Sequence, residues 1–461
     1  MPNQEPIRLC EWGSVNVDLT PDQRHRIFAA ADKWREYNRL PVPPLDFSGV
    51  DGTTLCTRQY VGVVEVEGIS IEIYPKLDSV LLESETVDEG AAKTVMRNLL
   101  WILEASGYAQ VIQTDTAHLE GTALTYDDLF SYLMAGDLLR QMEVGLAHTY
   151  VRQEDDIPWV RGRIRLEDQI TRNWMRPDRI ACSWDEFTPN IALNRMFKCA
   201  CRTLSQRVRH PFVSALLNDC VWMLDEAEDV DAFTALHDAA TIRWDRSNER
   251  FRHSFDVARQ LLSGMGYDLA SGESRTFVFL LDMNLVFEMY ALKVLETVVA
   301  VSVQYHDNIG YLIRKPRQRI RQIPDFWWNT SDACWIADAK YKFLFQGNVS
   351  PVSADEDADD WPVEGNGRWY LHPNDLRQIT VYAEILKRRL WGTAPVNLLV
   401  VYPYAGQGAF EIDDSVSELW NGSPLYLMPV KMTRCLGNDL RLAAPEKLPT
   451  QMMPVRDADV A

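Results

Sequence analysis

The chain has 461 residues, 46% of them hydrophobic and 25% charged, which is an ordinary globular composition. This composition excludes a disordered chain, a collagen-like fibre and a small disulfide scaffold, and the length allows about three domains. The formal net charge is −19, so any contact with DNA must depend on a local basic patch, a metal ion or a partner protein.

The cysteines and the apolar segments indicate a soluble protein of the cytoplasm. The chain has 8 cysteines, and because none forms a CxxC pair we expect buried, reduced thiols and no zinc site. The first residues lack the basic and apolar regions of a signal peptide. The most apolar stretch, residues 276–303, is interrupted by charged residues such as Asp282 and Glu288, so we expect no membrane contact.

The first 265 residues mix helices and strands, with a β-hairpin predicted at Tyr60–Tyr74 around Glu67-Gly68. The predicted helices are Pro21–Tyr37, Lys93–Ser106, Asp127–Leu146, Asn190–Arg209 and Pro211–Glu226. Between these helices we predict a strand at Ala147–Arg152, an acidic loop at 154–158 and a short basic strand at Trp159–Leu166.

A change in composition near Gly264 and Gly266 predicts a domain boundary. We therefore divide the chain into an N-terminal region 1–265, a second domain 266–410 and a C-terminal tail 411–461. The sequence contains no GxxxxGK[ST], GxGxxG, HExxH or GxSxG motif, so it has no P-loop of its own.

The second domain alternates between helix and strand. It begins with a predicted helix from 276 to about 300, followed by strands over 301–345. An acidic insert at 346–373, a helix at 374–390 and a strand at 395–403 come next. This alternation predicts an α/β (α+β) fold with a mixed sheet flanked by helices.

A predicted hairpin within 317–343 brings acidic and basic residues to one face. If Asn329–Asp332 form the loop, Asp325 lies opposite Ile336. Because side chains alternate along a strand, Asp338 and Lys340 then share the face of Asp325, with Asp338 one diagonal step away. A loop longer or shorter by one residue would move Asp325 to the opposite face.

Two carboxylates and a lysine on one face suit metal-dependent hydrolysis of a phosphodiester. Carboxylate oxygens select Mg²⁺ or Mn²⁺, and such an ion can polarise a phosphate and lower the pKa of a bound water. Lys340 could have a lowered pKa or act as a fixed positive charge. The alternative is a surface strand with a solvated aspartate and lysine, but CWIADAKYKF is too apolar on one face for a freely solvated edge.

The helices on either side of the hairpin offer further candidates. Glu288 falls on an apolar stripe, where it is either a ligand at the edge of the site or a buried ion pair or rim residue. Gln378 and Tyr382 are four residues apart on the following helix and share a face. Gln378 could order the attacking water or contact a phosphate, or the pair could be ordinary helix packing.

Basic residues enter the first strand of the hairpin. Arg317, Arg319 and Arg321 share a face with Asp325 if the strand is continuous, and they are candidate phosphate contacts. The alternative is a solvated edge strand whose charges prevent aggregation.

The order of these motifs resembles the McrC family, the nuclease subunits of McrBC 5-methylcytosine-dependent restriction systems. Pro324-Asp325 followed by Asp338-Ala339-Lys340 matches the PD-(D/E)xK nuclease pattern, with FEMY around Glu288 before it and DLRQxxxYA at 375–383 after it. Landmarks in the N-terminal half are VGVVEVEGISIEIYPKL (61–77), GLAHTY (145–150), RGRI (161–164) and FTPNIALNRMFK (187–198). The resemblance extends over about residues 58–403.

The resemblance implies a PD-(D/E)xK restriction-endonuclease-like core with Asp325, Asp338 and Lys340 as the active triad. Mg²⁺ or Mn²⁺ would be held by the two aspartates with help from the Ala339 carbonyl and Glu288, and Gln378 would be an additional catalytic candidate.

The resemblance also implies a partner, because McrC-type subunits have no motor. The N-terminal half would bind and stimulate a hexameric McrB-like AAA+ GTPase, so that GTP is bound by the partner and not by this chain. The partner would also recognise methylated DNA. Cutting both strands would require two complexes to meet.

Two other functions remain open from the sequence. One is a regulator that activates an AAA+ NTPase and has a weak or lost nuclease. The other is a standalone PD-(D/E)xK repair nuclease, which predicts Mg²⁺-dependent cutting by the purified chain alone.

Overall fold

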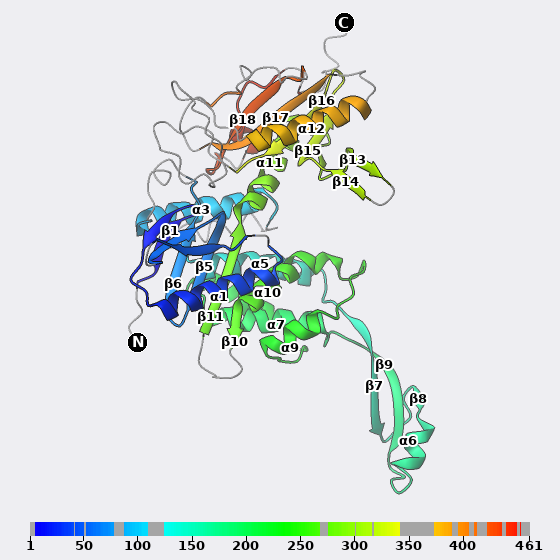
Figure 1. Cartoon of the computed structure of the whole chain (residues 1–461). Coiled ribbons are helices and arrows are strands. Elements are labelled where there is room, and N and C mark those ends of the chain that lie inside the picture. Colours follow the sequence, from blue (N-terminus) through cyan, green and yellow to red (C-terminus); the bar gives the residue numbers. More distant parts are fainter. Residues whose placement is uncertain are drawn as a thin grey trace. The chain divides into compact units, whose positions relative to one another are not determined.

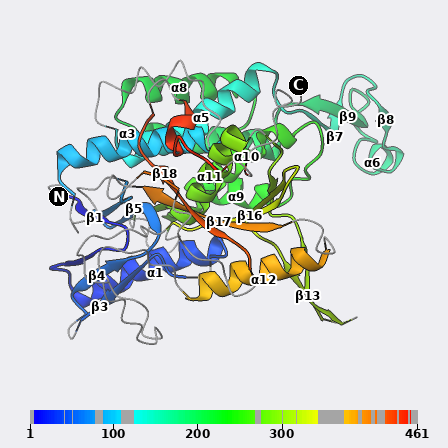
Figure 2. The same cartoon turned by 90° about the horizontal axis from the view of Figure 1, so that it is seen from above.

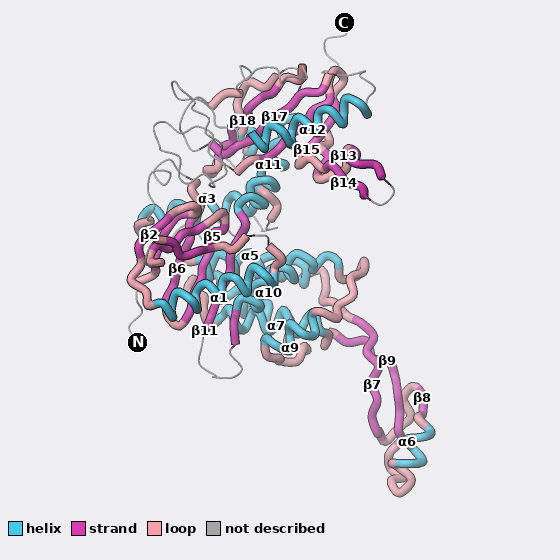
Figure 3. Tube along the Cα trace, viewed as in Figure 1, coloured by secondary structure: helices cyan, strands magenta, loops and turns pink. Residues whose placement is uncertain are grey.

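The computed structural model describes thirteen segments and residue 452. These segments are 5–40, 42–49, 52–77, 87–108, 124–267, 275–299, 301–315, 318–341, 373–389, 395–404, 410–412, 422–435 and 439–449. The predicted acidic insert 346–373 lies outside them except for its last residue. Figure 1 follows the chain in colour from one end to the other, and Figure 3 separates helices from strands. The mixture of sheets and helices confirms the predicted α/β class.

The chain divides into two compact units. The first unit consists of Met1–Ala109 together with Ser274–Ala461, and the second consists of Gln110–Glu273. The first unit therefore combines both ends of the chain, whereas the division made from the sequence treated 1–265 as one region.

One sheet of the first unit joins residues that are far apart in the sequence. Its strands β1 (Ile7–Cys10), β6 (Ile69–Tyr74), β5 (Tyr60–Val66) and β11 (Arg275–Asp282) lie side by side in that order. The predicted hairpin is confirmed, with Val66 paired to Ile69. The prediction of a helix starting at 276 is wrong, because 275–282 form β11, and the helix α11 spans Met283–Val299. Phe277, Val278, Phe279, Leu280 and Leu281 are all buried, as expected for a strand covered on both faces.

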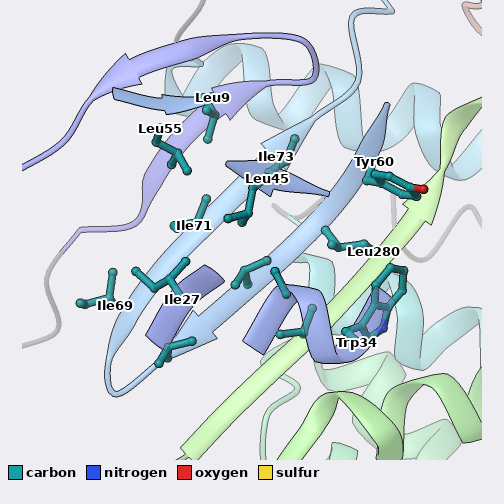
Figure 4. Packing of buried hydrophobic residues seen from close by; sticks show 14 of the residues in the cluster. Leu9, Ile27, Trp34, Leu45, Leu55, Tyr60, Ile69, Ile71, Ile73 and Leu280 are labelled. Atoms are coloured by element: carbon teal, nitrogen blue, oxygen red, sulfur yellow. The ribbon is translucent and has the colours of Figure 1, made fainter. Parts of the chain in front are cut away.

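The core on this sheet is closed by the helix α1 (Pro21–Tyr37), which begins and ends where the sequence predicts. Thr20 caps the helix, accepting a hydrogen bond from Gln23 N–H while the Gln23 side chain accepts one from Thr20 N–H. The helix buries Ile27 and Trp34 against the strands, and Figure 4 shows these two side chains among those of the sheet. A small sheet of β2 (Ser14–Asn16), β4 (Thr54–Thr57) and β3 (Leu45–Ser48) adds Leu45 and Leu55 to the same core.

The glycine at position 62, in the landmark at 61–77, is explained by the packing of the strands. Its φ is +144°, and a Cβ at this position would lie 2.2 Å from Phe279 O of β11. Any larger residue would push β11 away from β5, so the landmark is explained by strand packing.

A second sheet of the first unit has the order β12-β15-β16-β17-β18. These strands are β12 (Gln304–Tyr305), β15 (Phe326–Asn329), β16 (Cys334–Ala339), β17 (Val396–Tyr404) and β18 (Leu425–Lys431). The first three strands are antiparallel and the last three parallel, so the sheet is mixed as predicted. Residues 411–461, predicted to be a tail without pattern, contain β18 and the short helix η3 (Leu440–Ala443).

The helix α12 (Pro373–Arg389) covers one face of this sheet. Ile379, Ala383 and Leu386 pack against a face that includes Ile336 and Val400. Figure 2 shows α12 alongside β16 and β17. Asp338 follows Ile336 by two residues and therefore belongs to the face that α12 covers.

The remaining elements of the first unit are a helix and a hairpin. The helix α3 (Glu89–Ala105) packs on α11. Among the described strands, β13 (Gly310–Lys315) and β14 (Gln318–Gln322) pair with each other alone. This hairpin ends before Ile323-Pro324, because a proline has no N–H to donate to a continuing ladder.

The second unit is built mainly from helices. They are α5 (Tyr126–Glu143), α7 (Ala192–Ser205), α8 (Pro211–Met223), α9 (Ala232–Ala239), η1 (Glu249–Phe251) and α10 (Arg252–Gly264), the last followed by β10 (Met265–Tyr267). Buried polar groups tie the helices together, because Asp128 Oδ1 accepts hydrogen bonds from the Arg209 and His210 N–H groups, each at 2.9 Å. Asn194 donates to the carbonyls of Ala147 at 2.8 Å and Pro189 at 2.7 Å. This explains part of the FTPNIALNRMFK landmark by structure.

A β-arm extends from these helices (Figure 1). It consists of β7 (Thr149–Ile157), β9 (Ile180–Thr188), the short β8 (Arg163–Ile164) and the helix α6 (Leu166–Thr171). The prediction of an acidic loop at 154–158 is wrong, because residues 154–157 pair with β9. Gly162 of the RGRI landmark has φ +68°, and a Cβ there would lie 2.4 Å from Ser183 O, so only glycine lets this loop approach β9.

None of the described helices is long and apolar enough to cross a membrane. All the cysteines are free thiols, and apart from the half-buried Cys56 they are buried, as the sequence analysis expected.

Candidate active site

The predicted hairpin exists, but its register differs from the predicted one. Phe326 pairs with Ala337 and Asn329 with Cys334, which places Asp325 directly opposite Asp338 instead of opposite Ile336. The turn is tighter than predicted, because Thr330 N–H donates to Ala333 O at 2.9 Å and leaves only Ser331 and Asp332 at the tip. The register differs by two residues, so the two aspartates still share a face.

Asp338 is the most buried group of the site. The residue is 2% exposed, and its Oδ2 lies 2.6 Å from Lys340 Nζ. Its Oδ1 is buried and has no hydrogen-bond partner among the described residues. Such an oxygen is costly to bury unless something else binds it.

Asp325 is held beside Asp338 by the backbone. Its Oδ2 accepts a hydrogen bond from Ala339 N–H at 2.8 Å. The structure thus brings Ala339 to the site through its N–H, while a role for its carbonyl stays a prediction.

The carboxylates are electrostatically strained. Burial raises the pKa of Asp338, and the nearby Asp325 raises it further. Burial raises the pKa of Asp325 as well, with a second contribution from Glu288. Burial alone would lower the pKa of Lys340, but the surrounding carboxylates, led by Asp338, raise it. Of the two roles considered from the sequence, the raised pKa of Lys340 favours a positive charge held in place over a base.

Glu288 lies at the edge of the same site. The predicted apolar stripe around Glu288 is wrong, because the buried stripe of α11 runs through Val286, Phe287 and Tyr290, and Leu285, one turn before Glu288, is 43% exposed. The Glu288 side chain is 18% exposed, and its Oε1 lies 2.6 Å from His306 Nε2. Glu288, His306 and Asp325 offer ligand atoms that all lie within 4.8 Å of one another.

His306 also belongs to this group, although no sequence motif predicts it. Tyr305 of β12 pairs with Phe326 of β15, and this pairing brings His306 beside Asp325. The backbone N–H of His306 donates to the backbone carbonyl of Asp325 at 3.1 Å. A two-residue strand gives almost no periodic signal, so only the position of a histidine within the predicted strands 301–345 could have pointed to it.

The helix α12 adds a carboxylate and a tyrosine. Asp375 Oδ1 lies 3.7 Å from Lys340 Nζ. Gln378 Nε2 donates to Tyr382 Oη at 2.9 Å, and Tyr382 O–H donates to Ile323 O at 3.1 Å. Gln378 thus contacts Tyr382, which fixes the segment leading to Asp325. Among the described residues, Gln378 donates to Tyr382 and makes no hydrogen bond to either aspartate.

The predicted arginine face is not continuous with the site. Arg319 and Arg321 belong to the separate β13–β14 hairpin, and Arg317 lies outside the described residues. The break at Ile323-Pro324 means that strand alternation cannot be carried from Arg321 to Asp325. The continuous strand on which the predicted shared face depends is therefore not present.

The donor set fits a divalent cation that prefers oxygen ligands. Asp338 Oδ1 and Glu288 Oε1 are buried and accept no hydrogen bond from the described residues. Asp338 and Asp375 lie beside Lys340. Asp325 lies opposite Asp338, and Glu288 lies close to Asp325, so the carboxylates of the site outnumber its lysine and leave an excess of negative charge. Such an excess is typical of a cation site.

The solved structures that this chain resembles include two from Thermococcus gammatolerans. One is described as a refined half-complex from a tetradecameric assembly of McrB AAA+ hexamers with bound McrC, with 17% identity, a TM-score of 0.61 and coverage of 95% of this chain and 99% of that chain. The other is a cryo-EM structure of the McrBC complex, with 19% identity, a TM-score of 0.45 and coverage of 65% of this chain and 89% of that chain. At these identities the first match establishes a likeness of fold alone.

Comparison with curated proteins gives no match. Comparison with family profiles gives one that covers most of the chain, described as McrBC 5-methylcytosine restriction system component, over residues 55–358. This range includes Glu288, Asp325, Asp338 and Lys340, and it confirms the resemblance found in the motifs. The chain belongs to the family of McrBC 5-methylcytosine restriction system components.

Proposed function

We propose that this chain is the DNA endonuclease subunit of a modification-dependent restriction system and hydrolyses phosphodiester bonds with Mg²⁺ or Mn²⁺. The observation that carries the proposal is the convergence of Asp325, Asp338 and Lys340. Asp338 in particular is 2% exposed and keeps one oxygen without a hydrogen-bond partner among the described residues. A surface strand with solvated side chains, the alternative considered from the sequence, does not bury an aspartate in this way.

Asp325 and Asp338 would hold the ion, with the Ala339 carbonyl and Glu288 as further oxygen ligands. The bound ion would supply a polarised phosphate and a more acidic water. Ala339 N–H orients the Asp325 carboxylate, since it donates to Oδ2 at 2.8 Å. Lys340 is fixed between Asp338 and Asp375, where its charge can orient the attacking water and offset the charge that develops on the phosphate.

Gln378 and Tyr382 act in this scheme as positioning residues. Tyr382 binds the carbonyl of Ile323, two residues before Asp325, and Gln378 holds the Tyr382 hydroxyl. Their task is to fix the entry of the chain into the site. In the complex with DNA, Gln378 is a candidate ligand of water or phosphate.

The proposed partner is an McrB-like AAA+ GTPase that binds GTP and recognises methylated DNA. The solved relative with the similar fold is described as McrC bound to McrB AAA+ hexamers. This chain has no P-loop and a net charge of −19, so energy and much of the DNA affinity would come from the partner.

The β-arm is the surface that we assign to this partner. It exposes apolar side chains of a size that single domains normally bury. Their exposed fractions run from 43% to 72%, and they are Tyr150, Trp159, Val160, Ile164, Leu166, Ile170, Trp174, Met175 and Phe187. An arm of this kind gains stability from burial against another protein.

The experiment uses the full chain with and without its AAA+ partner, on methylated and unmethylated plasmid, with Mg²⁺ and GTP. We expect cleavage that needs the partner and GTP and is lost in Asp338→Asn. The matched control is Asp332→Asn, because Asp332 is an exposed aspartate at the tip of the same hairpin.

Two results would overturn this proposal. Cleavage by the chain alone would identify a standalone nuclease. Stimulation of the partner's GTPase without cleavage, equal in wild type and Asp338→Asn, would identify a regulator.

A further inference from the structure

A second group of ligand atoms lies beside the pair of aspartates. Glu288 comes from α11, His306 follows β12, and Asp325 precedes β15, so three separate elements converge there. Their ligand atoms lie within 4.8 Å of one another. Asp325 is common to this group and to the pair with Asp338, which would let one carboxylate serve two adjacent positions.

An ordinary ion pair explains the contact of Glu288 with His306 poorly. The atoms are 2.6 Å apart, yet Glu288 Oε1 is buried and accepts no hydrogen bond from the described residues. The imidazole N–H therefore does not point along the short contact. A short contact without a hydrogen bond is the geometry expected of two ligand atoms that both face one cation.

The imidazole is held in place by its surroundings. The backbone of His306 has φ +48°, a left-handed conformation that is rare outside glycine and asparagine. The backbone N–H of His306 donates to the backbone carbonyl of Asp325. Its ring stacks on Tyr305, with centroids 4.1 Å apart and an interplanar angle of 17°. Tyr305 in turn stacks on Phe326 of the central hairpin. A half-exposed histidine without a task has no need of such support.

We propose that Glu288, His306 and Asp325 hold a second divalent cation, a first-row transition ion such as Mn²⁺, beside the ion that Asp325 and Asp338 would share. The inference rests on the proposed function, because it takes the aspartate pair to be a cation site. The nitrogen ligand sets the second position apart. Imidazole binds first-row transition ions better than Mg²⁺, whereas a position made only of oxygen ligands suits Mg²⁺.

The test is Mn²⁺ binding to the purified full chain, followed by electron paramagnetic resonance. Unbound Mn²⁺ gives the stoichiometry, and pulsed spectra reveal ¹⁴N coupling when an imidazole binds the ion. The variant is His306→Asn, because asparagine tolerates the left-handed backbone but supplies no imidazole. The control is His25→Ala, an exposed histidine of α1.

We expect two Mn²⁺ ions in the wild type, one with ¹⁴N coupling. His306→Asn should lose the ¹⁴N coupling and bind that Mn²⁺ ion about 10–100-fold more weakly, while the affinity for the other ion stays unchanged. Asp338→Asn should weaken the uncoupled ion, and added Mg²⁺ should displace it before the coupled one.

Contrary results separate the two claims. One Mn²⁺ without ¹⁴N coupling, lost in Asp338→Asn and unchanged in His306→Asn, would overturn the second position and leave the proposed function standing. No bound Mn²⁺ in the wild type would overturn both.

Discussion

Asp338 and Lys340 form a pair in which the two members have opposite effects on stability. Asp338 is buried beside Asp325, and this raises its pKa, so the ionised form is disfavoured in the folded chain. Without divalent ions, Asp338→Asn should therefore raise the free energy of unfolding by about 1 kcal/mol or more. Lys340→Ala leaves the carboxylates without their cation and should lower it by about 1–3 kcal/mol.

The measurement is thermal unfolding in a chelating buffer, with cleavage assayed in parallel. Both variants should lose cleavage, and Asp332→Asn should change neither property. Equal destabilisation by both substitutions would contradict the role of charge crowding at Asp338. Repulsion between the buried carboxylates would then not be what destabilises the folded chain at this site.

At the scale of elements, Glu11 joins the end of β1 to the segment that follows Lys340. It is 1% exposed, and its Oε1 accepts hydrogen bonds from Lys76 N–H at 2.8 Å and Tyr341 O–H at 2.5 Å. Burial raises the pKa of Glu11 to about 8. The folded chain therefore binds one more proton at this residue than the unfolded chain, over the range from the ordinary value of 4.5 up to about 8.

This difference makes stability depend on pH. The contribution of Glu11 is complete at low pH and is lost as the pH rises through the folded pKa. Glu11→Gln cannot ionise, so between about pH 5 and pH 8 wild type should lose more stability than the variant, by on the order of 3 kcal/mol. Urea unfolding at pH 5 and pH 8 measures the free energy of unfolding of both proteins. If it changes by the same amount in wild type and in Glu11→Gln, Glu11 does not titrate as expected.

The β-arm makes a prediction about binding. Trp174 is 72% exposed, so Trp174→Ala should leave thermal unfolding of the chain unchanged. If the arm binds the AAA+ partner, burial of this side chain contributes about 2 kcal/mol, and the variant should bind about 30-fold more weakly. Trp222→Ala on α8 is the control, since Trp222 is 80% exposed in the same unit but lies outside the arm. An equal effect of both substitutions would argue against the arm as the binding surface.

The elements also explain how far the sequence could lead. The face shared by Asp325 and Asp338 was predictable because a strand alternates with period two, and a register error of two residues leaves the face unchanged. The tight turn at Ser331-Asp332 was not predictable, since Asn329–Asp332 offers equally good turn residues. The sequence predicts a helix from 276 because a strand buried on both faces is a continuous apolar run, which periodicity cannot tell from a buried helix. The place of His306 in the site follows from the pairing of the two-residue strand β12 with β15, and a strand this short cannot be read from the sequence.

At the scale of the whole molecule, charge and composition favour a subunit that works within a larger assembly. The net charge of −19 opposes the approach of DNA, and the proposed site itself holds more carboxylates than cations. A bound cation and a DNA-binding partner would both reduce this repulsion. One chain has one such site among its described residues, so each chain is expected to cut one strand.

The last prediction follows from this count of sites. If two complexes meet to cut both strands, a double-strand break needs two active chains, whereas a nick needs one. In complexes assembled from mixtures of wild type and Asp338→Asn, linear product should fall as the square of the wild-type fraction and total nicking in direct proportion to it. At equal amounts of the two chains, about one quarter of the linear product should remain, and nicked circles should accumulate. Agarose gels of plasmid digests measure both products, and mixtures with Asp332→Asn control for the effect of mixing. A linear product that instead falls in direct proportion to the wild-type fraction would mean that one chain cuts both strands in turn, because the second cut would then need no second active chain.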